Sequence, residues 1–327
     1  MRKINGFFNG MSNRAGVLGL SMALSLGAVS SAGATEYRSI ATATTTGAFY
    51  PIGGVMASLL NKMEGYNFTA EATGGSVENA RLIAAGDSHI GFFGGDTIWE
   101  AAHGTGPFEG RPPIDLAPIA NIFGMPLHFV ALENSGIKSL GDFQGKTIAV
   151  GAPGSGTGSK AQAVLEAAGY EYGKSVTARY LSFREGADAL VDGNADVVVI
   201  SVGMPSGNIQ EIGATHDIHL ANIEEGMRTE LVKKVPYFEK FTIPAGTYPT
   251  IDYDVETLSV STYLAVDRNM SESEVYEICK TLFKDRFKEF KRSHASLANI
   301  PLEDYPKSIV PLHPGAERFY REMGLIE

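Results

Sequence analysis

Hydrophobic positions between residues 39 and 93 alternate between the spacings typical of strands and of helices. Residues 39–44 and 68–72 have the composition of strands. Residues 52–63 place apolar side chains at i, i+3, i+4, i+7, i+8 and i+11, which is one face of a helix. A second helix over 77–85 and a strand over 90–93 follow. The pattern predicts a β-α-β-α-β unit with glycine-containing turns between its elements.

A second unit repeats this order further along the chain. Its strands are predicted at 146–150, 176–181 and 196–200, and its helices at 159–168 and 183–192. Gly47 and Gly154 are 107 residues apart, as are Gly86 and Gly193. Such units form parallel sheets with helices on their faces, and ligands bind beyond the carboxyl ends of the strands. The repeat therefore predicts an α/β protein with two lobes whose turns face one cleft.

Two long extended runs connect the units. Residues 117–132 link the first unit to the second, and residues 257–266 follow the second unit. If both runs cross between the lobes, they form a two-stranded hinge. A helix is then predicted to begin after Ser271, because Ser271 and Glu274 have the spacing of a capping box. We expect one lobe to hold residues 35–122 and 262–327 and the other to hold residues 123–261.

The first 34 residues have the order of a secretory signal peptide. Basic residues stand at positions 2, 3 and 14, an apolar stretch covers 15–29, and Ala32-Gly33-Ala34 forms an A-x-A site. We predict cleavage after Ala34, the alternative being an uncleaved anchor helix. Residues 35–327 carry 24 basic and 37 acidic side chains, a net charge of −13. This charge disfavours nucleic acid and anionic membranes as partners, and no direct membrane insertion is expected of the mature chain.

A glycine-rich stretch, residues 151–160, joins the predicted strand at 146–150 to a helix. Glycine lets the backbone approach a ligand, and the first amides of a helix attract anions. Ser155, Gly156 and Thr157 are therefore candidate ligand-binding residues. The spacing matches neither a Walker loop nor a dinucleotide fingerprint, and Pro153 stands where a nucleophile elbow needs glycine. A tight turn without a ligand is the alternative.

Candidate residues in the first unit lie at the corresponding turns. Ser76 is predicted to be a helix N-cap, which either satisfies the helix amides or offers its hydroxyl to a ligand. Phe49 and Tyr50 either wall a cleft or form a hydrophobic staple. Asp96 follows the third strand and either pairs with a ligand ammonium or caps the next helix. Ser182 and Glu185 have capping-box spacing, which favours a structural role.

No sequence motif indicates a catalytic or metal site. The histidines do not form an H-E-x-x-H motif, and the single cysteine, Cys279, excludes an internal disulfide. We therefore expect no metal, no cofactor and binding rather than turnover. A secreted α/β hydrolase is the alternative, because a Ser-His-Asp set can assemble from distant residues.

The order of these motifs resembles the TAXI family of solute-binding proteins, which serve TRAP-type transporters. The resemblance rests on TTGAFYPIGG at 45–54, TGGSVEN at 73–79, GFFGGD at 91–96, SLGDFQGKTIAVGAPGSGT at 139–157, residues 192–205 and IPAGTY at 243–248. It covers nearly all of residues 35–327.

The resemblance implies a type II periplasmic binding protein, a two-lobed receptor that closes on its ligand. It also implies a small carboxylate ligand similar to glutamate or 2-oxoglutarate, a periplasmic location and TRAP membrane subunits as partners. A receptor that presents its ligand to a sensor protein would share this fold, and the role of Lys160 stays open. The match assigns the ligand-binding residues Thr46, Phe49, Tyr50, Gly75, Ser76, Asp96, Ser155, Gly156, Thr157, Gly203 and Pro205.

Overall fold

The strands of the described chain join into one mixed sheet. The computed structural model describes residues 35–298 and 300–327, so the predicted signal peptide and its cleavage site lie outside the described residues. The strands are β1 (Glu36–Ala41), β2 (Tyr66–Glu71), β3 (Ile90–Gly94), β4 (Leu116–Leu132), β5 (Thr147–Ala149), β6 (Thr177–Arg179), β7 (Val197–Ser201), β8 (Ile218–Leu220), β9 (Glu239–Ile243) and β10 (Val255–Asp267).

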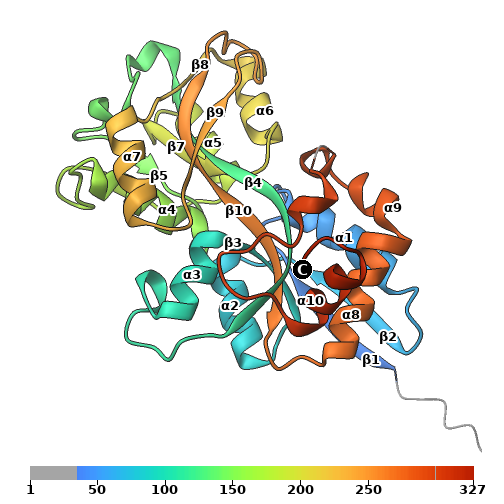
Figure 1. Ribbon diagram of the computed structural model, residues 1–327. Coiled ribbons are helices and arrows are strands. Elements are labelled where there is room, and N and C mark those ends of the chain that lie inside the picture. The colour runs from blue at the N-terminus through green and yellow to red at the C-terminus, as the bar shows by residue number, and fades with distance from the viewer. Residues whose placement is uncertain (1–34, 299) are drawn as a thin grey trace, which may run out of the picture. The chain divides into compact units, whose positions relative to one another are not determined.

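Helices follow most of these strands (Figure 1). They are α1 (Phe49–Leu60), α2 (Ser76–Ala85), α3 (Gly95–His103), α4 (Gly156–Ala167), α5 (Phe183–Val191), α6 (Gly207–Thr215), α7 (Glu225–Lys234), α8 (Glu272–Lys280), α9 (Phe287–Lys291) and α10 (Pro314–Glu322). Short 3-10 helices are η1 (Gly106–Phe108), η2 (Glu133–Ser135), η3 (Leu140–Asp142), η5 (Ala295–Leu297) and η6 (Leu302–Asp304), and η4 (Thr281–Asp285) is a π-helix.

The two predicted units are present and have the same strand order. In the first unit β1 pairs in parallel with β2 and β3, and in the second β5 pairs in parallel with β6 and β7. The third strand of each unit, β3 or β7, is buried along its whole length. Such continuous apolar runs are typical of parallel strands covered on both faces. The duplication predicted from hydrophobic spacing is confirmed.

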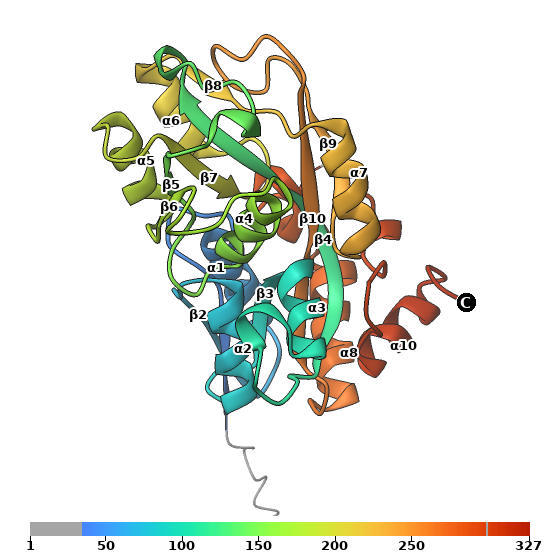
Figure 2. The ribbon, with the colours of Figure 1, turned by 90° about the vertical axis from the view of Figure 1, so that its left-hand side faces the viewer.

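Two long strands connect the units, as the extended runs predict. β4 and β10 lie antiparallel, from the pair Ser259 and Pro126 to the pair Asp267 and Leu116. β10 also pairs with β3 of the first unit, whereas β4 pairs with β7 of the second. Figures 1 and 2 show the two strands side by side between the units. They form the predicted two-stranded hinge, while the residue boundaries of the lobes stay a prediction.

Local sequence accounts for where several helices begin. α1 buries the apolar stripe of Ile52, Met56 and Leu60, as its spacing predicts. α5 begins at the capping box of Ser182 and Glu185, and α8 begins at Ser271, whose hydroxyl accepts the Glu274 N–H. The reciprocal half of the second box is missing because the Glu274 carboxylate pairs with Arg38 instead.

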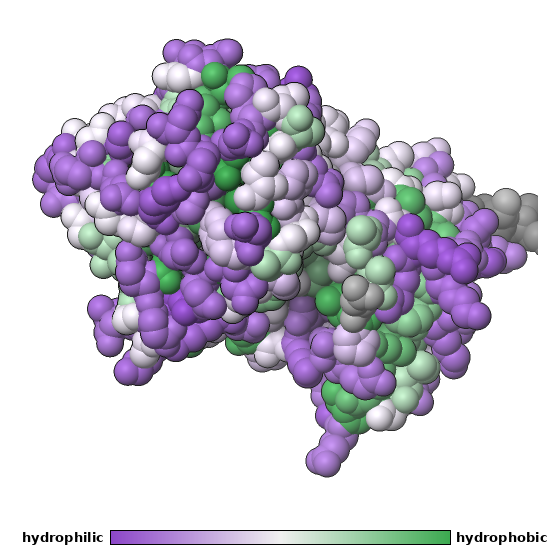
Figure 3. Space-filling model, turned by 90° about the horizontal axis from the view of Figure 1, so that it is seen from above, coloured by the Kyte–Doolittle hydropathy of each residue, from purple (hydrophilic) through white to green (hydrophobic). Residues whose placement is uncertain are grey.

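The surface seen from above carries both hydrophilic and apolar residues. Hydrophilic residues are widespread on the face in Figure 3, and apolar areas interrupt them, most clearly toward the lower right. In the part of the chain that the structure describes, no helix combines the length and the apolar character that crossing a membrane requires.

Candidate functional site

A hollow lies where turns of the two units meet. At about 50 Å³, it has room for about four water-sized groups in this conformation, because one water needs about 10–15 Å³. The loops after β1, β2, β5 and β7 contribute most of its walls. The lining residues are Ala43, Thr44, Gly47, Ala48, Phe49, Gly74, Gly75, Ser76, Met125, Ala152, Ser155, Gly156, Thr157, Lys160, Phe183, Ser201 and Val202.

The N-terminus of α4 opens onto this hollow. Ser155 is the N-cap residue, but its side chain makes no capping hydrogen bond. Within the described chain, the amides of residues 156–158 have no acceptor. The Ser155 Oγ is buried and has no partner there, and the same holds for the Ser201 Oγ at the end of β7. Amides, helix dipole and hydroxyls together form a group of donors suited to an anion.

The N-terminus of α2 has a different environment. Its N-cap is Gly75, at φ 119°, so the prediction that Ser76 caps this helix is wrong. Ser76 is instead the first helical residue, and its Oγ accepts the Gly94 N–H at 3.1 Å. Gly75 takes the cap position because its backbone angle lies in the left-handed region, which disfavours a side chain. The Ser76 hydroxyl proton stays available to a group in the hollow.

The glycine turns of the two units touch beside the hollow. The Val77 and Glu78 amides of α2 donate to the Gly154 carbonyl oxygen at 3.1 and 3.2 Å. A Cβ on Gly74 would lie 2.5 Å from the Pro153 carbonyl oxygen. The contact therefore requires glycine at position 74, and the second unit's loop occupies most of the helix terminus that could otherwise hold an anion.

Asp96 and Lys160 form a buried ion pair. They belong to α3 and α4, which lie next to each other in Figure 2. The Lys160 Nζ donates to the two carboxylate oxygens at 3.1 and 3.0 Å. The Lys160 side chain is 2 % exposed and the Asp96 side chain 0 %. Asp96 lies in the first turn of α3 without capping it, because the N-cap is Gly94. It pairs with a lysine of its own chain, an alternative that sequence analysis did not consider.

The ion pair extends into a buried polar group. Glu100 lies one turn after Asp96 on α3 and accepts a hydrogen bond from the Tyr237 hydroxyl at 3.3 Å. Burial and the nearby Asp96 charge raise the pKa of Glu100 to about 8. Tyr237 follows α7, so Glu100, like Asp96, contacts a residue far along the chain.

The aromatic residues at the first turn differ in placement. Phe49 lines the hollow and stacks on Phe92 with ring centroids 5.0 Å apart, so it is both part of the wall and part of the core. Tyr50 is 37 % exposed and does not line the hollow. Phe183, at the start of α5, supplies the second aromatic wall.

The loop after β7 is held by a buried histidine and a tyrosine. The Tyr248 hydroxyl lies 2.9 Å from the His128 Nε2 and accepts the Ser206 N–H at 3.1 Å. The other ring nitrogen of His128 lies 3.0 Å from the Ile200 carbonyl oxygen, and burial lowers the pKa of His128 to about 4. A neutral His128 thus fixes both ends of the segment that carries Ser201.

The structure brings six of the eleven predicted ligand-binding residues to the hollow, namely Phe49, Gly75, Ser76, Ser155, Gly156 and Thr157. Thr46 and Pro205 are exposed and Asp96 is buried in its ion pair. Gly203 is buried, and a Cβ there would lie 2.2 Å from the Ser296 Oγ. The sequence analysis predicted ligand-binding residues after β7, at Gly203 and Pro205, but did not select Ser201 and Val202, which line the hollow.

No histidine or carboxylate belongs to the lining within the described residues. The hydrolase alternative would need such a base beside Ser155 or Ser201.

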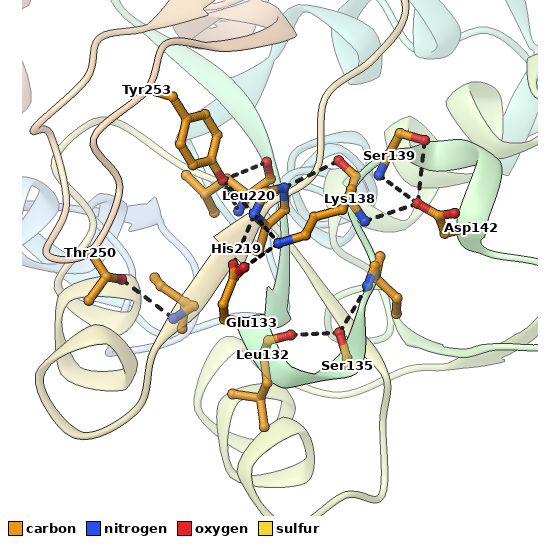
Figure 4. Close-up of polar contacts among 12 residues, drawn as sticks. Leu132, Glu133, Ser135, Lys138, Ser139, Asp142, His219, Leu220, Thr250 and Tyr253 are labelled. Carbon is orange, nitrogen blue, oxygen red and sulfur yellow. Dashed lines mark hydrogen bonds and ion pairs between the residues drawn. The ribbon is translucent and has the colours of Figure 1, made fainter.

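A second polar cluster lies outside the hollow (Figure 4). The His219 Nδ1 lies 3.1 Å from the Glu133 Oε2 and 3.0 Å from the Tyr253 hydroxyl. Lys138 pairs with Glu133, and its carbonyl oxygen lies 3.3 Å from the His219 Nε2. The cluster ties β8 to the segment after β4, which is a structural role.

Comparisons with known proteins agree with this architecture. PhnD1 from Prochlorococcus marinus, solved with methylphosphonate, is 12 % identical over 89 % of this chain and 100 % of that chain, with a TM-score of 0.55. MatC from Rhodopseudomonas palustris, solved with bound malate, is 16 % identical over 89 % and 99 %, with a TM-score of 0.53. At these identities the likeness shows the fold, which is that of type II periplasmic binding proteins.

A structure from a study of glutathione import through GshT and the ABC importer TcyBC of Streptococcus mutans is also similar. It is 14 % identical over 79 % of this chain and 92 % of that chain, with a TM-score of 0.51. The sequence itself matches the model of the NMT1-like family over residues 40–324. Since the match spans most of the sequence, the chain belongs to the NMT1-like family.

Proposed function

We propose that this chain is a periplasmic receptor that captures a small organic anion by closing its two lobes around it. The ligand acid group docks on the N-terminus of α4. We further propose that the receptor is of the TAXI type and delivers its ligand to TRAP membrane subunits. The exported, acidic mature chain predicted from the sequence supports this location.

One observation carries the proposal. The N-terminus of α4, whose first amides have no acceptor among the described residues, faces the hollow. The hydroxyls of Ser155 and Ser201, which also lack a partner there, line the same hollow. Ser201 is 6 % exposed, and a buried polar group without a partner is rare unless something else binds it. An acid group at this position would satisfy the amides and both hydroxyls at once.

The energies involved require several contacts to act together. A micromolar ligand needs about 8 kcal/mol of binding free energy, whereas one helix terminus contributes about 0.3–2 kcal/mol. Hydrogen bonds to a charged group add about 1.5–3 kcal/mol each. The amides and two or three hydroxyls, with burial against Phe49 and Phe183, reach that range.

Calorimetry on residues 35–327 tests the dock. The protein is titrated with C3–C6 mono- and dicarboxylic acids and acidic amino acids after removal of any copurified ligand. We expect at least one to bind at micromolar concentration and Ser155→Ala with Thr157→Val to weaken it at least tenfold. Ser271→Ala removes an N-cap hydroxyl outside the hollow and serves as the control. Unchanged affinity in the double variant would refute the dock.

The transporter class needs a separate experiment. The TAXI-like motifs support a TRAP permease, while the fold is shared with a structure described for an ABC importer system. Uptake of the identified acid in cells is measured after collapse of the ion gradient and after depletion of ATP. Loss of uptake with the gradient alone supports TRAP coupling. Uptake that depends on ATP at an intact gradient contradicts it, and a receptor for a sensor protein would give no uptake.

A further inference from the structure

We propose that the ligand is a short organic acid that has a second oxygen acceptor and no ammonium group. This inference rests on the proposed function, because it concerns the same hollow. It excludes amino acids and favours 2-oxo and related acids.

Charge at the hollow has one sign. Lys160 is the only charged side chain in the described lining, and its charge is paired with Asp96. The adjoining terminus of α4 therefore supplies the uncompensated partial positive charge. Asp96, the carboxylate that could have received an ammonium, is 0 % exposed and does not line the hollow. Both of its oxygens accept hydrogen bonds from Lys160. A ligand ammonium would therefore be buried without a carboxylate partner, which is strongly unfavourable.

Other carboxylates near the site are also engaged elsewhere. The Glu78 Oε2 accepts the Gly74 N–H at 2.6 Å, and Glu100 lies beyond Asp96 with Tyr237 as its donor. Neither of the two side chains lines the hollow.

Several hydrogen-bond donors face the hollow. The Ser76 Oγ already accepts the Gly94 N–H, so this hydroxyl is left to donate its proton. The carbonyl oxygens of Ala152 and Gly154 are taken by backbone N–H groups. The open α4 amides can only donate, and the hydroxyls of Ser155 and Ser201 can donate as well. An acid with a further oxo oxygen can accept from several of these groups at once.

The size of the hollow and its apolar walls narrow the class of ligand further. The hollow has room for about four water-sized groups, and Phe49, Met125 and Phe183 give it apolar walls. A short carbon chain with oxygens toward α4 and Ser76 fits this arrangement better than a long or cationic one.

Matched pairs of acids test the inference by calorimetry on residues 35–327. The pairs are pyruvate and alanine, 2-oxobutyrate and 2-aminobutyrate, and 2-oxoglutarate and glutamate, each differing in the oxo and amino groups. We expect at least one oxo acid to bind, and at least tenfold more tightly than its amino partner. Ser76→Ala should weaken the oxo acid at least fivefold, whereas Ser271→Ala should not.

Two outcomes would overturn the inference, a third would refute its proposed donor, and all three are distinguishable. Equal or tighter binding of an amino acid refutes it while the receptor function stands. Absence of binding to every acid in both panels refutes the proposed function and the inference with it. If Ser76→Ala unfolds like wild type and keeps full affinity for the oxo acid, the proposed donor role of Ser76 is refuted.

Discussion

Removal of one member of the Asp96–Lys160 pair should strongly destabilise the folded chain. The ammonium and carboxylate lie 3.0 Å apart at 2 % and 0 % exposure. At an effective dielectric constant of about 20, two charges at this distance attract by about 5.5 kcal/mol. Lys160→Met or Asp96→Asn abolishes that attraction and leaves the other charge buried. We expect each single variant to lose about 3–5 kcal/mol of unfolding free energy.

Urea unfolding of residues 35–327 without ligand measures this loss. The double variant removes both charges, so its destabilisation should be smaller than the sum of the singles by about 2 kcal/mol or more. Lys174→Met is the control, because its pair with Glu171 is 77 % and 62 % exposed and should contribute less than about 1 kcal/mol. Single variants within about 1 kcal/mol of wild type, or additive effects, would refute the reasoning.

Two further predictions concern the surroundings of this pair. A Cβ on Gly156 would lie 2.8 Å from the Asp96 Oδ2 and 3.1 Å from the Lys160 Nζ, so Gly156→Ala should cost about 1–3 kcal/mol in urea unfolding. Gly226→Ala, with open space around it, should be neutral or stabilising, and equal effects of both would contradict the crowding. Because burial raises the pKa of Glu100 to about 8, its contribution to stability is full below about pH 4.5 and is lost as the pH rises through about 8. Between about pH 5 and 8, the unfolding free energy of Glu100→Gln should therefore rise relative to that of wild type, by at most about 1.4 kcal/mol per pH unit. A stability difference between the two proteins that does not change with pH would contradict this.

Most of the fold was predictable because its signals are local. Apolar spacing located α1, α2 and α5, and uninterrupted apolar runs located β3 and β7. The extended character of β4 and β10 predicted the hinge, since runs of that length must pass beyond a single lobe. These features depend on residues a few positions apart, which is the range that periodicity and turn chemistry describe.

The composition of the site was only partly predictable because it depends on distant contacts. Asp96 and Lys160 are 64 residues apart. The residues that flank each of them in the sequence therefore do not indicate the ion pair. Ser76 has the residue type of an N-cap, yet the backbone angle of Gly75 moves the cap by one position. The placement of Ser201 rather than Gly203 at the hollow depends on how β7 ends against β4.

Duplication by itself would give the hollow two equivalent anion sites, one at α2 and one at α4. The structure breaks that symmetry through a single carbonyl group. Gly154 turns its oxygen toward the amides of Val77 and Glu78, so the first helix terminus is largely satisfied within the protein. The first amides of α4, beside Ser155, have no acceptor in the part of the chain that the structure describes. This asymmetry favours a ligand that places one acid group at α4 and the rest of its body against Ser76 and Phe49. It disfavours an extended ligand with acid groups on both helix termini.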